Sequence, residues 1–117
     1  MEYRLTAKAG TKAKQHISKE AEKLVDLANA RLRNQAPYKG RYIVRLYLDE
    51  IKEVVGESRA QAVLVEALAK GRDISFSAGG STWLLFSSVY FDGAFLKLEY
   101  WAGAVSMLRA LSMEVKE

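Results

Sequence analysis

The chain has 117 residues, 50% of them hydrophobic, which suits one domain with one buried core. It contains no cysteine and one histidine, which excludes disulfides, thiolate metal sites and clusters of histidine ligands. The 18 Lys and Arg residues outnumber the 14 Asp and Glu residues, giving a formal net charge of +4. No apolar run has the length of a signal-peptide core or a membrane-spanning helix, so we expect a cytoplasmic protein without membrane contact. The scarcity of Asn and Gln beside many charged residues is compatible with a thermophilic source.

The first part of the chain predicts a strand followed by a long helix. Residues 2–8 alternate apolar and polar side chains, which predicts a short strand, at a sheet edge because of its charges. The helix begins at Thr11 or, with a better local cap, at Ser18, and ends near Asn34. One apolar stripe marks its buried face: Ile17, Ala21, Leu24, Val25, Ala28 and Leu32.

Residues 41–48 alternate as a strand with one apolar face and one mixed face. The apolar face is Tyr42, Val44, Leu46 and Leu48, and the mixed face is Arg41, Ile43, Arg45 and Tyr47. Two helices follow. Asp49 is suited to cap the first, which Gly56 ends, and Ser58 to cap the second, which Gly71 ends.

The last third changes to the two-residue period of strands. Residues 74–78 alternate and lead into a tight Gly79-Gly80 turn, after which residues 82–91 are apolar on both faces. That pattern predicts a central strand, or a strand with one face packed against a second subunit. Asp92-Gly93 predicts a hairpin, because both residues tolerate positive φ, and residues 95–101 return as its partner. Gly103 then separates this strand from a closing helix, residues 104–115.

The resulting order is β-α-β-α-α-β-β-β-α over residues 1–117. We expect a single α+β domain with a mixed or mostly antiparallel sheet, built around the C-terminal meander and packed by helices.

Residues for catalysis are scarce. His16 is the only histidine, and we place it on the first helix, at the edge of the apolar stripe. No nucleophile elbow, metal-ligand spacing or phosphate-binding glycine loop is present. We therefore expect a protein that is not an enzyme and needs no cofactor or metal.

The charge is distributed unevenly along the chain. Residues 1–47 carry eleven Lys and Arg against four Asp and Glu, whereas residues 48–117 carry seven against ten. Basic side chains release counterions when they meet phosphates, and aromatic rings stack on bases, so this half predicts contact with DNA or RNA. The alternation of residues 41, 43, 45 and 47 is also the pattern by which single-stranded RNA binders present a sheet face. The candidate residues are Lys12, Lys19, Lys23, Arg31, Arg33, Tyr38, Lys39, Arg41, Arg45 and Tyr47.

The alternative hypothesis is a homo-oligomeric scaffold or protein-interaction module, most simply a homodimer, with no nucleic-acid role. It rests on the doubly apolar stretch of residues 82–91, which has more aromatic surface than a small domain easily buries. The candidate self-association residues are Trp83, Phe86 and Tyr90.

Overall fold

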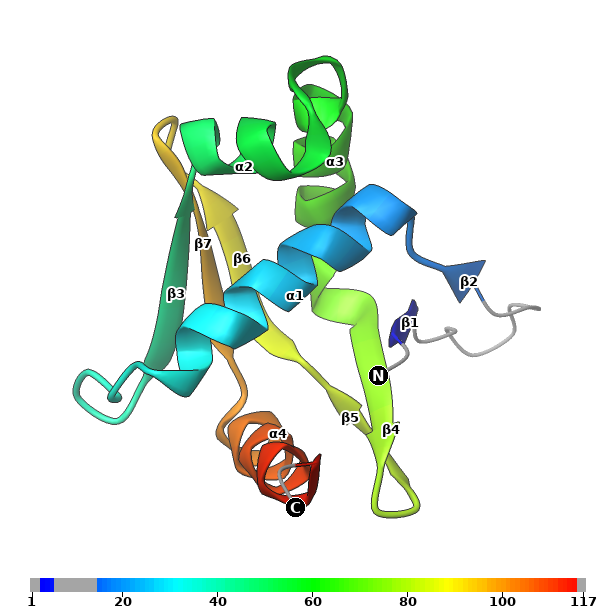
Figure 1. Cartoon of the computed structure of the whole chain (residues 1–117), viewed down its shortest axis with the longest axis vertical. Coiled ribbons are helices and arrows are strands. Elements are labelled where there is room, and N and C mark those ends of the chain that lie inside the picture. The colour runs from blue at the N-terminus through cyan, green and yellow to red at the C-terminus, as the bar shows by residue number, and fades with distance from the viewer. Residues whose placement is uncertain (1–2, 6–14, 116–117) are drawn as a thin grey trace.

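The computed structural model describes residues 3–5 and 15–115 and confirms an α+β domain (Figure 1). Its strands form two sheets, of order β2-β1-β4-β5 and β3-β7-β6, in which all pairs are antiparallel. The first sheet contains β1 (Tyr3–Leu5), β2 (Gln15–His16), β4 (Ile74–Ala78) and β5 (Ser81–Leu84). The second contains β3 (Tyr42–Tyr47), β6 (Phe86–Phe91) and β7 (Phe95–Tyr100). The helices are α1 (Lys19–Arg33), α2 (Leu48–Val55), α3 (Glu57–Lys70) and α4 (Ala102–Val115), with a 3-10 turn, η1 (Gly71–Asp73), before β4.

The expected meander is divided between the two sheets at Leu85. This residue is fully buried and lies between β5 and β6. Its N–H donates to the carbonyl of Ile74 at 3.0 Å, whereas its carbonyl accepts from the N–H of Trp101 at 3.1 Å. The prediction of one continuous strand over residues 82–91 was therefore wrong. The apolar character of both faces reflects a chain that crosses from one sheet to the other.

The start of α1 follows the better of its two predicted caps. Ser18 has extended backbone angles, and its hydroxyl accepts from the N–H of Ala21 at 3.1 Å. Since the helix begins after Ser18, His16 lies in β2, and its placement on the helix was wrong. Strand β1 lies between β2 and β4, so the prediction of an edge position was also wrong.

Three helix starts differ from their predictions by a few residues. Helix α2 begins at Leu48, before Asp49, with Tyr47 as its N-cap residue, and the carboxylate of Glu50 accepts from the N–H of Tyr47 at 2.9 Å. Helix α3 begins before Ser58, because Gly56, with φ of 93°, alone joins the end of α2 to the start of α3. Gly103 lies inside α4, where a Cβ atom would come within 3.3 Å of the ring of Trp83.

The predicted hairpin after β6 is confirmed, but Asp92 contributes in a different way. Only Gly93 has positive φ, at 101°. The carboxylate of Asp92 instead accepts from the N–H groups of Ala94 and Phe95, at 2.8 and 3.1 Å. These bonds hold the pKa of Asp92 below its usual range.

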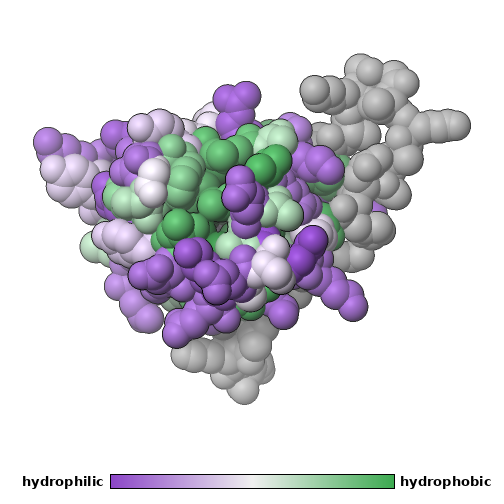
Figure 2. Space-filling view, turned by 90° about the horizontal axis from the view of Figure 1, so that it is seen from above, coloured by the Kyte–Doolittle hydropathy of each residue, from purple (hydrophilic) through white to green (hydrophobic). Residues whose placement is uncertain are grey.

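The core lies where the helices meet the inner face of the second sheet. Val44, Leu46 and Leu98 on that face are buried together with the apolar stripe of α1. Figure 1 shows α1 crossing between the two sheets, with α2 and α3 on the same side of the second sheet and no helix against its other side. Viewed from above α2 and α3, apolar side chains gather on the surface (Figure 2). The exposed large ones on α3 are Val65 and Leu68.

One buried polar network joins the two sheets through α1. The amide of Asn29 donates to the hydroxyl of Tyr3 at 2.6 Å and accepts from the hydroxyl of Tyr100 at 2.7 Å. The hydroxyl of Tyr3 also donates to the carboxylate of Asp26 at 3.3 Å. Burial raises the pKa of both tyrosines, and the Asp26 carboxylate raises that of Tyr3 further. Both hydroxyls therefore stay neutral and hold β1, α1 and β7 together.

Candidate nucleic-acid interface

The outer face of the second sheet is set by the pairing of three strands. In β3 and β7, Arg45 lies opposite Lys97 and Tyr47 lies opposite Phe95. In β7 and β6, Lys97 in turn lies opposite Tyr90. Because the side chains of paired residues point to the same side of a sheet, these five side chains form one surface, the outer face.

Three aromatic rings and two cations alternate on this outer face. The rings of Tyr47 and Phe95 meet edge to face, with centroids 5.5 Å apart. The guanidinium of Arg45 lies 5.5 Å from the centroid of Phe95, and the ammonium of Lys97 lies 6.0 Å from that of Tyr90. Tyr47 and Tyr90 are 51% and 54% exposed. The surface therefore offers ring faces and cations to a ligand that stacks and carries negative charge.

Arg41 lies at one end of this face and is already paired. Its Nε and a terminal nitrogen donate to the two carboxylate oxygens of Glu99, at 3.0 and 2.7 Å. This pairing raises the pKa of Arg41 and lowers that of Glu99. In the described part of the chain, Arg45 and Lys97 form no such ion pair, so they are the cations available for phosphates.

Arg31 binds the edge of β3 that lies on the side opposite β7. Its guanidinium donates to the carbonyl of Arg45 at 2.9 Å and forms a bidentate pair with Glu50, which in turn accepts from the N–H of Tyr47. The side chain of Gln35 donates to the carbonyl of Ile43 on the same edge. These contacts leave Arg31 engaged in holding the edge, so its predicted place among phosphate-binding residues is not supported by its geometry.

The Arg31–Glu50 pair predicts a loss of stability in acid. In the folded state, the pKa of Glu50 is lowered from its ordinary value of 4.5. The larger cause is hydrogen bonding to Arg31, and a smaller one is the hydrogen bond from the N–H of Tyr47. A carboxylate whose pKa is lower in the folded state than in the unfolded state stabilises the fold at pH values above its unfolded pKa. This stabilisation is lost as the pH falls through its folded pKa. In urea unfolding from about pH 6 to about pH 3, Glu50→Gln should lose up to about 1 kcal/mol of stability at the upper end and show a weaker acid dependence.

Glu53→Gln is the matched control for that experiment, because Glu53 is an exposed glutamate on the same helix. It should retain the acid dependence of the unchanged protein. Equal pH profiles for the two variants would contradict the structural role of the Arg31–Glu50 pair.

The other predicted basic and aromatic residues do not share one surface. Tyr38 and Lys39 lie in the turn that leads into β3, where Tyr38 is exposed and the Lys39 ammonium lies 5.4 Å from its ring centroid. Arg33 is exposed in the last turn of α1. Lys19 and Lys23 are exposed on α1, which packs against the inner side of the sheet, so they face away from the outer face. Lys12 lies outside the described residues.

The three predicted self-association residues lie in three different environments. Trp83 packs beside Gly103 of α4 and donates its ring N–H to the carbonyl of Ala78 at 3.0 Å. Phe86 is 2% exposed and stacks on Tyr100 in the core, so its prediction as a surface residue was wrong. Tyr90 belongs to the outer face. Because the chain changes sheets at Leu85, these three side chains do not form one surface.

Phe95 and Lys97 are candidates that the sequence analysis missed. The alternation of residues 95–101 placed Lys97 on the polar face of its strand, but a single strand does not reveal which strand lies next to it. Their place beside Arg45 and Tyr47 depends on the pairing of β7 with β3, about fifty residues earlier in the chain.

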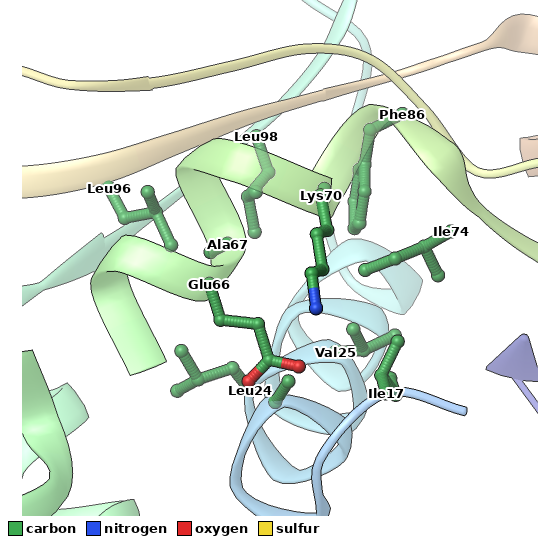
Figure 3. Close-up of a pocket in the computed structure, with 12 residues that line it drawn as sticks. Ile17, Leu24, Val25, Glu66, Ala67, Lys70, Ile74, Phe86, Leu96 and Leu98 are labelled. Atoms are coloured by element: carbon green, nitrogen blue, oxygen red, sulfur yellow. The ribbon is translucent and has the colours of Figure 1, made fainter. Parts of the chain in front are cut away.

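An apolar pocket lies between α1, α3 and residues of β4, β6 and β7 (Figure 3). It has a volume of about 390 Å³, including its open mouth, and Glu66 and Lys70 are the charged residues among the described ones that line it. The carboxylate of Glu66 accepts from the N–H and hydroxyl of Ser18, at 3.0 and 2.5 Å, which ties α3 to the start of α1. Since Glu66 is engaged in this way and the lining other than Glu66 and Lys70 is apolar, we assign no reaction to the pocket.

Within the part of the chain that the structure describes, no three His, Asp or Glu side chains gather as a metal site. None of the helices in that part combines the length and apolar character needed to cross a membrane. Comparisons with protein-family models, curated proteins and solved structures gave no significant match. The fold and the outer face thus define an α+β protein with a mixed aromatic and basic sheet surface.

Proposed function

We propose that this protein is a small non-catalytic binder of single-stranded nucleic acid, DNA or RNA, and that the outer face is its binding surface. One observation carries the proposal: strand pairing gathers Arg45 and Lys97 with Tyr47, Phe95 and Tyr90 on a side of the sheet that no described helix covers. Rings on a sheet stack on unpaired bases, while neighbouring cations neutralise the phosphates between them.

A flat sheet face favours a single strand over a duplex. The bases of a duplex are stacked on one another, so their ring faces are closed to Tyr47 and Tyr90. A single strand can lay its bases on both rings. Each such stack contributes about 1–3 kcal/mol in proteins of this kind.

Only part of the basic first half of the chain lies on the outer face. Arg45 and Tyr47 belong to the outer face, and Arg41 lies at one end of it, paired with Glu99. Tyr38 and Lys39 lie in the turn before β3. Lys19 and Lys23 contribute only a general electrostatic attraction, because they lie on α1, on the other side of the sheet from the outer face.

Fluorescence anisotropy with labelled single-stranded RNA, single-stranded DNA and duplex DNA tests the proposal over a salt series. The double variant Arg45→Glu/Lys97→Glu should bind at least about tenfold more weakly and show a shallower salt dependence. The control Lys23→Glu/Arg33→Glu makes the same change in net charge on α1 and should bind almost as well as the unchanged protein.

A second variant separates stacking from charge. Tyr47→Ala/Tyr90→Ala leaves the net charge unchanged and should weaken single-strand binding by tenfold or more. No binding at low salt would reject the function. Equal loss in the outer-face and α1 charge variants would reject the outer face as the site.

A further inference from the structure

The two edge strands of the second sheet differ in how their backbone is covered. On β3, Gln35 and Arg31 donate to the outward carbonyls of Ile43 and Arg45. The N–H of Tyr47 donates to the carboxylate of Glu50. Next to β6, the N–H of Asp92 donates to the carbonyl of Phe95 of β7 at 3.3 Å. In an antiparallel pair, alternate residues point their backbone groups to the same side. Val89 and Phe91, which lie three residues and one residue before Asp92, therefore point their N–H and carbonyl groups away from β7. In the described part of the chain, these groups of Val89 and Phe91 have no hydrogen-bond partner.

Residues 88–91 of β6 lack the side chains that usually protect an edge strand. From residue 74 to residue 91 the chain has no charged side chain and no proline. Natural edge strands are commonly blocked by lysine, proline, a bulge or a covering segment. The bulge in β6 lies at its beginning, between Phe86 and Ser88, and leaves residues 88–91 as a regular edge.

We infer that β6 is the site of self-association, and that a second copy of the chain pairs with it antiparallel across a two-fold axis. In the simplest register Val89 of each copy lies opposite Val89 of the other, which joins two three-stranded sheets into one of six strands. A two-fold axis brings identical residues together, so a charged strand would repel itself. This strand is uncharged, and the register places Asp92 near the uncharged Phe86 end of the other copy.

Apolar surface next to β6 can add side-chain burial to this backbone pairing. The end of α3 lies against β6, because Gly71 packs so closely on Val89 that a Cβ atom at residue 71 would come within 2.8 Å of its methyl group. The preceding turns of α3 expose Leu68 and Val65, which are 46% and 58% exposed. Figure 2 shows apolar surface on the side of the molecule where α2 and α3 lie.

Such a dimer would extend the outer face. Tyr90 of one copy would lie beside Ser88 of the other, so the two aromatic and basic surfaces would become continuous. The dimer does not depend on nucleic-acid binding, and each proposal can fail without the other.

Mass in solution, measured by sedimentation velocity over a wide range of protein concentrations, tests the inference. The unchanged protein should form a reversible dimer. Ser88→Lys places a cation at the edge on an exposed position and should shift the protein to a monomer. Thr82→Lys is the matched control, since it adds the same charge to an exposed hydroxyl residue on β5, an edge strand of the other sheet, and should leave the dimer intact.

Amide hydrogen exchange of the unchanged protein provides a readout that needs no variant. Exchange at Val89 and Phe91 should slow as the concentration rises and the dimer forms, whereas the amide of Tyr90, which faces β7, should exchange slowly throughout. A monomer at every concentration, or a dimer that Ser88→Lys leaves intact while Val89 and Phe91 exchange freely, would overturn the inference.

Discussion

Asn29→Ala is expected to lower the free energy of unfolding by about 2–4 kcal/mol, because Asn29 is the shared partner of two buried hydroxyls. Without the amide, the hydroxyl of Tyr100 has no partner among the described residues, and that of Tyr3 has only the longer contact to Asp26. A buried polar group that loses its partner costs about 1–3 kcal/mol, and the side chain removed also leaves a small cavity.

Urea unfolding followed by circular dichroism measures this effect. Asn34→Ala is the control, because Asn34 is an exposed asparagine at the end of the same helix and should change stability by only about 0.5 kcal/mol. The triple variant Asn29→Leu/Tyr3→Phe/Tyr100→Phe should recover much of the loss, since it removes the polar groups together. If Asn29→Ala costs no more than Asn34→Ala, the network does not stabilise the fold.

Phe86→Ala should be at least as damaging, at about 3–5 kcal/mol, because Phe86 is a large core side chain. Its ring lies edge to face with that of Tyr100, with centroids 4.8 Å apart, so the substitution also removes an aromatic contact. A domain of ordinary stability has about 5–15 kcal/mol in total, so this one change would remove a large share of it.

The same variant separates a core residue from an interface residue. A residue at a subunit interface alters stability in a way that depends on protein concentration, whereas a core residue lowers it equally at all concentrations. We expect the second behaviour for Phe86→Ala, measured by urea unfolding at two concentrations. Tyr90→Ala, measured where the protein is monomeric, should change stability little, because Tyr90 is half exposed. A stability loss for Phe86→Ala that appears only at high protein concentration would show that Phe86 acts at a subunit interface and would contradict its place in the core.

Several local features of this fold could be predicted because short-range chemistry decides them. Ser18 caps α1 through its own hydroxyl, and Gly79-Gly80 and Gly93 supply the backbone angles that two tight turns need. Helix starts were less well predicted. At α2 the N-cap residue is Tyr47 rather than Asp49, and its N–H donates to the carboxylate of Glu50. Either acid in the first turn can accept from a free N–H group, and only the local backbone geometry selects one.

The candidate site was predicted only in part. The mixed face of β3 was found from its alternation, and Arg45 and Tyr47 do lie on an uncovered surface. Phe95 and Lys97 were missed, and Arg31 was assigned a phosphate role although it pairs with Glu50. Each of these outcomes depends on a contact between residues far apart in the sequence, which neither periodicity nor charge count contains.

The sequence by itself determined the α+β class, the order of its main elements and the alternation that gives each strand two different faces. These properties depend on side-chain period, caps and turns, which act over a few residues. Only the tertiary structure decided that the chain changes sheets at Leu85, that β7 lies between β3 and β6, and that one sheet edge is sealed while the other is open. These features depend on which distant parts of the chain pack together. A strand needs neighbouring segments to pair its backbone N–H and carbonyl groups and to bury its apolar face, and its own sequence does not determine which segments those are.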